Sequence, residues 1–170
     1  MTNRWGICLE NWRRPSEEVN ALMGLLKEYL QKECQEMVQN NIRLNAIGRI
    51  EDLPFDVQMT LGDTMRKTEG CDGMMLNLAL SYGGRSEIIH AVQGILSDLQ
   101  KGKVKPEEIT IQRFPEYLWT YGIPDPDLLI RTSGEYRISN FLLWQIAYTE
   151  LYVTETLWPD FDRKELLKAI

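Results

Sequence analysis

The chain has 170 residues, of which 44% are hydrophobic and 26% are charged, and this balance predicts one soluble globular domain over 1–170. The net charge of −6 argues against a broad nucleic-acid interface, which needs a basic face, so no nucleic-acid partner is expected. The single histidine excludes a multi-histidine metal site within the chain. The three cysteines are an odd number without metal-ligand spacing, which favours a reducing compartment. No apolar run approaches the roughly 18 residues of a membrane span, which predicts a cytoplasmic protein and leaves peripheral membrane contact open.

Hydrophobic spacing predicts helices and strands in alternation along the first half of the chain. The expected helices cover 16–39 and 54–68, and the expected strands cover 42–47 and 74–80. The first helix begins after Pro15, with Ser16 as its capping residue. The apolar run at 74–80 is typical of a parallel strand covered on both faces, and Asn77 is its one polar interruption.

The second half continues this alternation. Helices are expected over 86–99, 141–147 and 162–170, short helical pieces within 106–119, and strands over 127–130 and 151–154. The helix at 86–99 is expected to carry Ile88, Ile89, Val92, Ile95 and Leu96 on one face. Strands that alternate with helices predict an α/β fold with a mostly parallel central sheet flanked by helices. Ligands of such folds bind beyond the carboxyl ends of the strands.

A polar loop over 131–140 follows the predicted strand at 127–130. Arg131 and Arg137 can form paired hydrogen bonds to phosphate oxygens, and Gly134 would let backbone amides approach a ligand. Serine and threonine hydroxyl groups in the loop would add further polar contacts. The pattern therefore predicts a diphosphate pocket. The alternative is a solvated polar loop, in which Glu135 either orders the arginines or only neutralises them.

Glu150 is the candidate metal ligand. It lies between two apolar segments, where a carboxylate is costly to desolvate unless a cation pairs with it. Mg²⁺ would combine this carboxylate with water and substrate phosphate oxygens. The alternative is a glutamate on an exposed strand edge.

A second polar segment, 10–15, lies directly before the first predicted helix. An arginine at this helix N-terminus could meet a second anionic group, and an exposed arginine without a ligand is the alternative. The chain lacks the P-loop, dinucleotide-binding and serine-hydrolase glycine motifs, so those three activities have no support.

Several segments together resemble the cis-prenyltransferase family, typified by undecaprenyl diphosphate synthase. They are ENWRRP at 10–15, LNLA at 76–79, YGGR at 82–85, DLLIRTSGE at 127–135 and RISNFLLWQ at 137–145. The likeness runs from about residue 6 to residue 165 in the same order, and the blocks after 127 are highly specific.

The resemblance implies a Mg²⁺-dependent transferase that condenses isopentenyl diphosphate with an allylic diphosphate such as farnesyl diphosphate. The product would be a cis-polyprenyl diphosphate for lipid-carrier biosynthesis, and the enzyme would be a homodimer. The residues implied in isopentenyl diphosphate binding are Arg131, Arg137, Ile138 and Ser139. Glu150 would reach the metal site from the neighbouring subunit.

The resemblance also implies roles near the start of the chain. Trp12 and Arg14 would line the allylic side, and the apolar face of the helix at 16–39 would form one wall of a tunnel for the growing hydrocarbon. Asn11 stands at the catalytic position proposed as proton acceptor. An amide is a poor base, so Asn11 is expected to orient substrate or water, with the leaving diphosphate as proton sink.

Two departures from the family pattern limit this expectation. The aspartate-containing motif Met-Asp-Gly-Asn-x-x-Trp, which binds Mg²⁺ in family members, is absent, and Cys8 stands where a serine is usual. The chain is therefore expected to be the larger, C-terminal part of an N-terminally truncated catalytic domain. The alternative is a noncatalytic fragment or pseudoenzyme that retains only the isopentenyl diphosphate-binding half.

Overall fold

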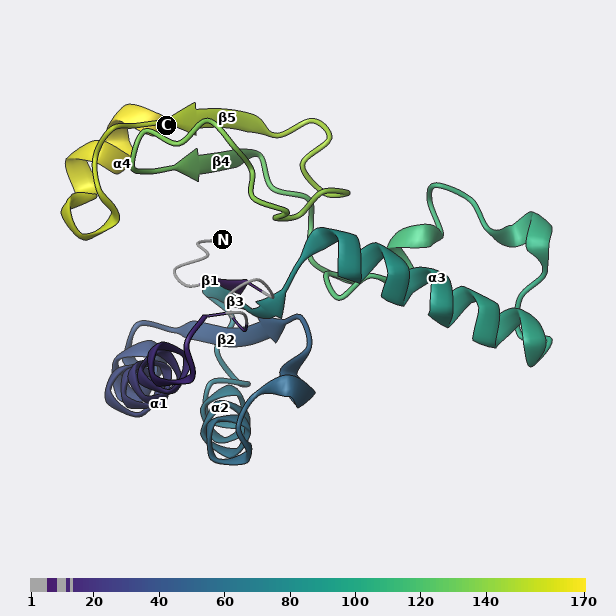
Figure 1. The fold of residues 1–170 in the computed structure, drawn as a ribbon, viewed down its shortest axis with the longest axis horizontal. Coiled ribbons are helices and arrows are strands. Elements are labelled where there is room, and N and C mark those ends of the chain that lie inside the picture. Colours follow the sequence, from purple (N-terminus) through teal and green to yellow (C-terminus); the bar gives the residue numbers. More distant parts are fainter. Residues whose placement is uncertain (1–5, 9–11, 13) are drawn as a thin grey trace. The chain divides into compact units, whose positions relative to one another are not determined.

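The computed structural model of the chain describes residues 6–8, 12 and 14–170, with the backbone alone for 6–8. The chain divides into two compact units, Met1–Gly83 and Gly84–Ile170, and each has its own sheet of parallel strands (Figure 1). The α/β class with parallel strands and flanking helices is thereby confirmed. A single domain over 1–170 stays a prediction. Within the described part of the chain, no helix is both long enough and apolar enough to cross a bilayer.

The first unit is a three-stranded parallel sheet packed against two helices. Its strand order is β1-β3-β2, and the strand bounds are Gly6–Cys8 for β1, Ile42–Ile47 for β2 and Met74–Tyr82 for β3. Helices α1 (Ser16–Gln39) and α2 (Phe55–Lys67) lie side by side along one face of the sheet (Figure 1). Strand β1 is an addition to the elements that the sequence predicted.

Strand β3 is the centre of this sheet and pairs in parallel with both neighbours. Its register with β2 runs without a shift from Ile42 opposite Met74 to Ile47 opposite Ala79. Asn77, the polar interruption of the apolar run, is only 4% exposed and accepts a hydrogen bond from Asn45 Nδ2 at 2.8 Å. This bond satisfies a buried amide and helps to fix the register.

A hydrophobic core holds the helices on this sheet. Its buried members are Met23, Leu26, Leu30, Met37, Leu44, Leu53, Val57, Leu61, Leu76, Leu78 and Leu80. The bounds predicted for α1 are confirmed, because the helix covers the predicted range 16–39. Its buried residues follow helical spacing over this whole range. The predicted Ser16 cap is wrong. Pro15 holds the capping position, and it forms no side-chain hydrogen bond there.

The second unit contains helix α3 (Gly84–Gln100), a parallel strand pair and a short terminal helix. The pair is β4 (Leu128–Arg131) with β5 (Glu150–Val153), and the terminal helix is α4 (Arg163–Ala169). Short 3₁₀ helices occupy Pro106–Glu108 and Phe114–Tyr117 between α3 and β4, and Trp158–Asp160 before α4.

The apolar face predicted for α3 is buried at Ile95 but exposed at three of its five positions. Ile89, Val92 and Leu96 are 58%, 40% and 52% exposed. The buried positions of this helix are Gly84, Glu87, Ala91 and Ile95. The buried face and the apolar face therefore overlap only in part, because the buried face includes Glu87, which accepts a hydrogen bond from Gln145.

The helix predicted over 141–147 is also wrong. This segment forms turns, with one helical hydrogen bond from Ile146 N to Leu142 O at 3.1 Å. Leu142 has φ +47, which a right-handed helix does not allow. The backbone therefore prevents the apolar run from continuing as a helix.

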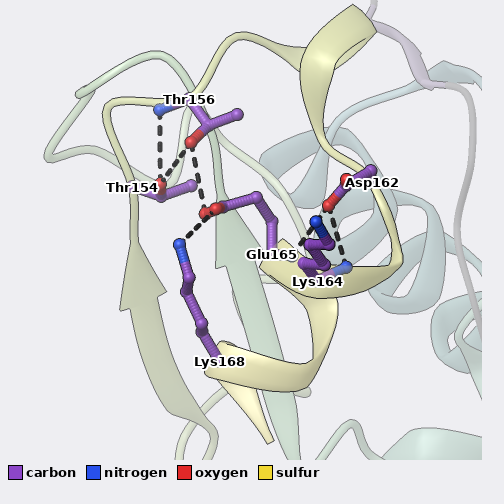
Figure 2. A network of polar contacts seen from close by, with 6 residues as sticks. All are labelled: Thr154, Thr156, Asp162, Lys164, Glu165 and Lys168. Atoms are coloured by element: carbon purple, nitrogen blue, oxygen red, sulfur yellow. Dashed lines mark hydrogen bonds and ion pairs between the residues drawn. The ribbon is translucent and has the colours of Figure 1, made fainter.

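Polar contacts fix α4 to the segment that follows β5 (Figure 2). Thr156 Oγ1 donates to Glu165 Oε2 at 3.3 Å, and Lys168 Nζ contacts the other oxygen of the same carboxylate. The hydrogen bond with Glu165 raises the pKa of Lys168. Asp162 caps the helix by accepting from the amides of Lys164 and Glu165 at 2.8 and 3.0 Å.

Candidate functional site

The loop 131–140, which we call the arginine loop, leaves the carboxyl end of β4 and brings two guanidinium groups to one carboxylate. Arg131 Nη2 lies 3.0 Å from Glu135 Oε2, and Arg137 Nη2 contacts the same oxygen. The Arg131 side chain is 36% exposed and that of Arg137 is 68% exposed. Glu135 thus orders both arginines, and the three side chains together carry one net positive charge.

The Nε group of Arg131 is a buried donor. No hydrogen-bond acceptor for it is found among the residues that the structure describes. A buried N–H without an acceptor costs about 1–3 kcal/mol, so such groups call for an explanation such as a bound anion or water. The guanidinium is held by Glu135 on one side and retains hydrogen-bonding capacity for a ligand.

The backbone of the arginine loop is strained at several positions. Positive φ occurs at the non-glycine residues Ser133 (+67), Ser139 (+46) and Asn140 (+58), and also at Gly134 (+63), where it carries no steric cost. Residues with side chains rarely adopt this region, and such strain gathers at ligand sites because the surrounding structure must hold it in place. Sequence reasoning did not predict this strain.

The expected role of Gly134 is not supported. Its amide donates to Thr154 O at 2.9 Å, and the amide of Ser133 donates to Thr156 O at 3.0 Å, so both are engaged within the protein. A Cβ at Gly134 would crowd the carboxylate of Glu155. The glycine therefore allows the approach of the Glu155 side chain, and the amides of Ser133 and Gly134 are not available to a ligand.

The end of the arginine loop is held at the N-terminus of α3. Asn140 accepts through its backbone oxygen from Gly84 N at 2.7 Å, and through Oδ1 from Arg85 N at 2.9 Å. Ser139 is exposed directly before this cap, and Ile138 is half-buried and accepts from Phe141 N at 3.0 Å. Ile138 and Ser139 thus lie on the same rigidly held loop as Arg137.

A buried polar cluster lies beside this cap and escaped sequence reasoning. Glu87 on α3 is fully buried, and Gln145 donates through Nε2 to Glu87 Oε2 at 3.1 Å and to Thr120 Oγ1 at 2.7 Å. These bonds connect α3 with the segment that follows the arginine loop. The spacing of Glu87 four residues before Ala91 and eight before Ile95 was the available signal for its burial.

Glu150 is exposed at the first residue of β5, as the alternative interpretation of its sequence context expected. It lies opposite Leu128 in the register of the strand pair, whereas Arg131 lies opposite Val153. Glu150 and Arg131 are therefore offset by three residues along the strands, which is about 10 Å. Within one chain Glu150 and the arginine loop therefore lie at opposite ends of the β4–β5 pair.

The N-terminal candidates lie in the first unit, and Asn11 falls outside the described residues. The side chain of Cys8 is outside them as well. Trp12 is half-buried and donates through Nε1 to Ser81 Oγ at 2.9 Å. Arg14 is exposed and lies 3.7 Å from Glu18 Oε2, one turn along the start of α1.

Residues 3–170 match a protein-family model described as "Putative undecaprenyl diphosphate synthase". Isoprenyl transferases of Heliobacterium mobile and Geobacter sulfurreducens are 53% and 52% identical to the chain over 166 and 161 residues, which are 98% and 95% of its length. The chain spans 64% and 65% of the length of these two curated relatives.

Two solved structures share the fold. Lavandulyl diphosphate synthase from Lavandula x intermedia, in complex with dimethylallyl diphosphate, has a TM-score of 0.94 and 37% identity over 97% of this chain and 72% of that one. A probable undecaprenyl diphosphate synthase from Campylobacter jejuni has a TM-score of 0.85 and 34% identity over 96% of this chain and 74% of that one. By sequence and by fold, the chain belongs to the undecaprenyl diphosphate synthase family of cis-prenyltransferases.

Proposed function

We propose that the protein is a prenyltransferase that condenses isopentenyl diphosphate with an allylic diphosphate and releases a cis-polyprenyl diphosphate. The observation that carries the proposal is the arginine loop, where Glu135 orders two guanidiniums and the buried Nε of Arg131 has no acceptor among the described residues. A diphosphate supplies the missing acceptor and the opposite charge. The lavandulyl diphosphate synthase structure, which contains dimethylallyl diphosphate, supports an allylic diphosphate as the second substrate.

The roles of this chain's residues in the reaction are to bind and orient. Arg131 and Arg137 hold the diphosphate of isopentenyl diphosphate, with Ser139 beside it and Ile138 against its carbon chain. Trp12 and Arg14 line the allylic side. The new carbon–carbon bond forms as the carbon–oxygen bond of the allylic substrate breaks and its diphosphate group leaves. The proton lost from the isopentenyl unit passes to the released diphosphate. Asn11 orients substrate or water.

Mg²⁺ belongs to the same proposal. The described residues contain no group of three or more side chains that could hold a metal by themselves. One exposed carboxylate, that of Glu150, suits Mg²⁺ nevertheless, because this ion keeps several waters and takes its remaining ligands from substrate phosphates. The ion, when bound, neutralises diphosphate charge.

Homodimer formation would explain how Glu150 serves this site. The strand pair separates Glu150 from the arginine loop of its own chain, so the carboxylate that meets a diphosphate there comes from a second copy. Cytoplasmic location and peripheral membrane contact, through which a long hydrocarbon product would leave, are parts of the same proposal.

Mixed dimers test the contribution of Glu150 from the second subunit. Arg131→Ala and Glu150→Ala proteins should each lack elongation activity, whereas co-expression of the two should restore about a quarter of the wild-type sites, since half of the dimers are mixed and each has one intact site. Co-expression of Arg131→Ala with Arg137→Ala is the matched control and should restore nothing, because both residues serve the same subunit's site. An Arg131→Ala and Glu150→Ala mixture that stays inactive would contradict the role of Glu150 across the dimer.

The proposed function itself is tested by product formation. Incubation of the chain with labelled isopentenyl diphosphate, farnesyl diphosphate and Mg²⁺ should give elongated product, and removal of Mg²⁺ should abolish it. A folded dimer that forms no product but binds isopentenyl diphosphate would favour the alternative, a noncatalytic fragment or pseudoenzyme that retains the isopentenyl diphosphate-binding half. The chain's span of 64% of a curated relative is the observation behind this alternative.

A further inference from the structure

Ser81 is a buried serine near the carboxyl end of β3, and its backbone adopts an unfavourable conformation. Its φ is +47, and it has no exposed surface. Glycine adopts positive φ without steric cost, whereas a serine at such a position needs another reason. The contacts of the hydroxyl group supply such a reason.

The hydroxyl group of Ser81 connects two other side chains of the first unit. Trp12 Nε1 donates to Ser81 Oγ at 2.9 Å, and Ser81 Oγ donates to Asp52 Oδ2 at 3.2 Å. A serine hydroxyl has one proton, so donation to the carboxylate leaves its lone pairs for the indole N–H. The carboxylate thus sets the direction of both hydrogen bonds.

Asp52 is in turn held by Arg49. Arg49 Nε lies 3.1 Å from Asp52 Oδ2, and Arg49 Nη2 donates to Asp52 Oδ1 at 3.1 Å. This forked pair fixes the orientation of the carboxylate as well as its charge. Arg49 also donates through its backbone amide to Ser81 O at 3.4 Å. We call Trp12, Arg49, Asp52 and Ser81 the Ser81 network.

The Ser81 network lies at the edge of the sheet where a ligand is expected. Ser81 is near the end of β3, and Arg49 and Asp52 follow the end of β2, so the network is at the carboxyl ends of parallel strands. Trp12 packs its ring against the hydrophobic core of the first unit. Because an indole has a single N–H, the hydrogen bond to Ser81 sets the orientation of this ring.

We propose that Asp52 and Ser81 are positioning residues for the allylic substrate, acting through the Trp12 indole. The inference rests on the proposed function, in which Trp12 lines the allylic side. Asp52 and Ser81 act on the ring, and the ring face meets the prenyl chain. Loss of the hydroxyl group frees the indole to rotate, so it weakens allylic binding and leaves isopentenyl diphosphate binding by Arg131 intact.

Four substitutions distinguish a positioning role of Asp52 and Ser81 from a role in folding. Ser81→Gly removes the hydroxyl and leaves a residue that accepts φ +47, so the fold is retained. Asp52→Ala removes the acceptor, and Asp52→Asn keeps an oxygen for Ser81. Asp63→Ala is the matched control, because Asp63 also pairs with an arginine three residues away, Arg66, on α2.

Two measurements are made on each variant. One is the indole N–H resonance of Trp12, identified among the five tryptophans by its loss in Trp12→Phe. The other is a pair of dissociation constants by calorimetry, for farnesyl diphosphate and for isopentenyl diphosphate. Ser81→Gly and Asp52→Ala should each shift the Trp12 resonance. Each should also weaken binding of farnesyl diphosphate about three- to ten-fold, which is the effect of losing one neutral hydrogen bond. Isopentenyl diphosphate should bind unchanged.

The Asp52→Asn and Asp63→Ala variants serve as controls for these two measurements. Asp52→Asn should recover affinity for farnesyl diphosphate to within about three-fold of wild type, and Asp63→Ala should match wild type. A Ser81→Gly protein that binds both ligands as wild type does, or loses both to the same degree, overturns the positioning role. Wild-type protein that binds neither diphosphate overturns the proposed function, and this inference with it.

Discussion

Arg131→Ala should weaken binding of isopentenyl diphosphate by about a hundred-fold, or about 2.7 kcal/mol. The substitution removes a guanidinium that Glu135 holds at 3.0 Å, together with the buried Nε donor. Of the two arginines, it also leaves the Glu135 carboxylate with only Arg137 to balance its negative charge, which disfavours a bound diphosphate. Titration calorimetry with isopentenyl diphosphate measures this loss.

Arg113→Ala is the matched control for this substitution. The Arg113 side chain is 34% exposed, close to the 36% of Arg131, and it also pairs with carboxylates, those of Glu108 and Glu116. It lies outside the arginine loop, so isopentenyl diphosphate should bind to this variant as to wild type. Equal losses in the two variants would show a general charge effect and would contradict a specific diphosphate site at Arg131.

Leu30→Ala should lower the free energy of unfolding by about 2–5 kcal/mol. Leu30 has no exposed surface and belongs to the core between α1 and the sheet, so its truncation leaves a cavity that the packed neighbours fill only in part. Urea denaturation followed by circular dichroism measures the change.

The same substitution at Leu25 is its control. Leu25 lies on the same helix and is 53% exposed, so Leu25→Ala changes helix propensity equally without opening a cavity. Its effect should stay within about 0.5 kcal/mol. Similar losses at both positions would contradict the assigned buried face of α1.

The sequence predicted the first unit well because its buried surfaces are apolar. Helix α1 carries its core residues at helical spacing over its whole length, and β3 is a nearly continuous apolar run, so pattern and burial agree. Helix α3 shows where this reasoning fails. Its buried face includes Glu87, which accepts a hydrogen bond from Gln145, 58 residues further along the chain, and no local pattern contains that partner.

The candidate site was predictable in composition but not in geometry. The residues of the arginine loop follow from its arginines and hydroxyl groups, yet the shared contact of Arg131 and Arg137 with Glu135 depends on backbone turns at positive φ. Spacing alone likewise could not show that Glu150 is exposed at the far end of the β4–β5 pair, since that depends on the strand register.

The most direct test of the account is a structure of the protein crystallised with isopentenyl diphosphate. We expect the diphosphate oxygens to lie within hydrogen-bond distance of the guanidinium groups of Arg131 and Arg137, with Arg131 Nε among the donors. A diphosphate bound elsewhere, with no contact to either arginine, would contradict the assignment of the arginine loop as the isopentenyl diphosphate site.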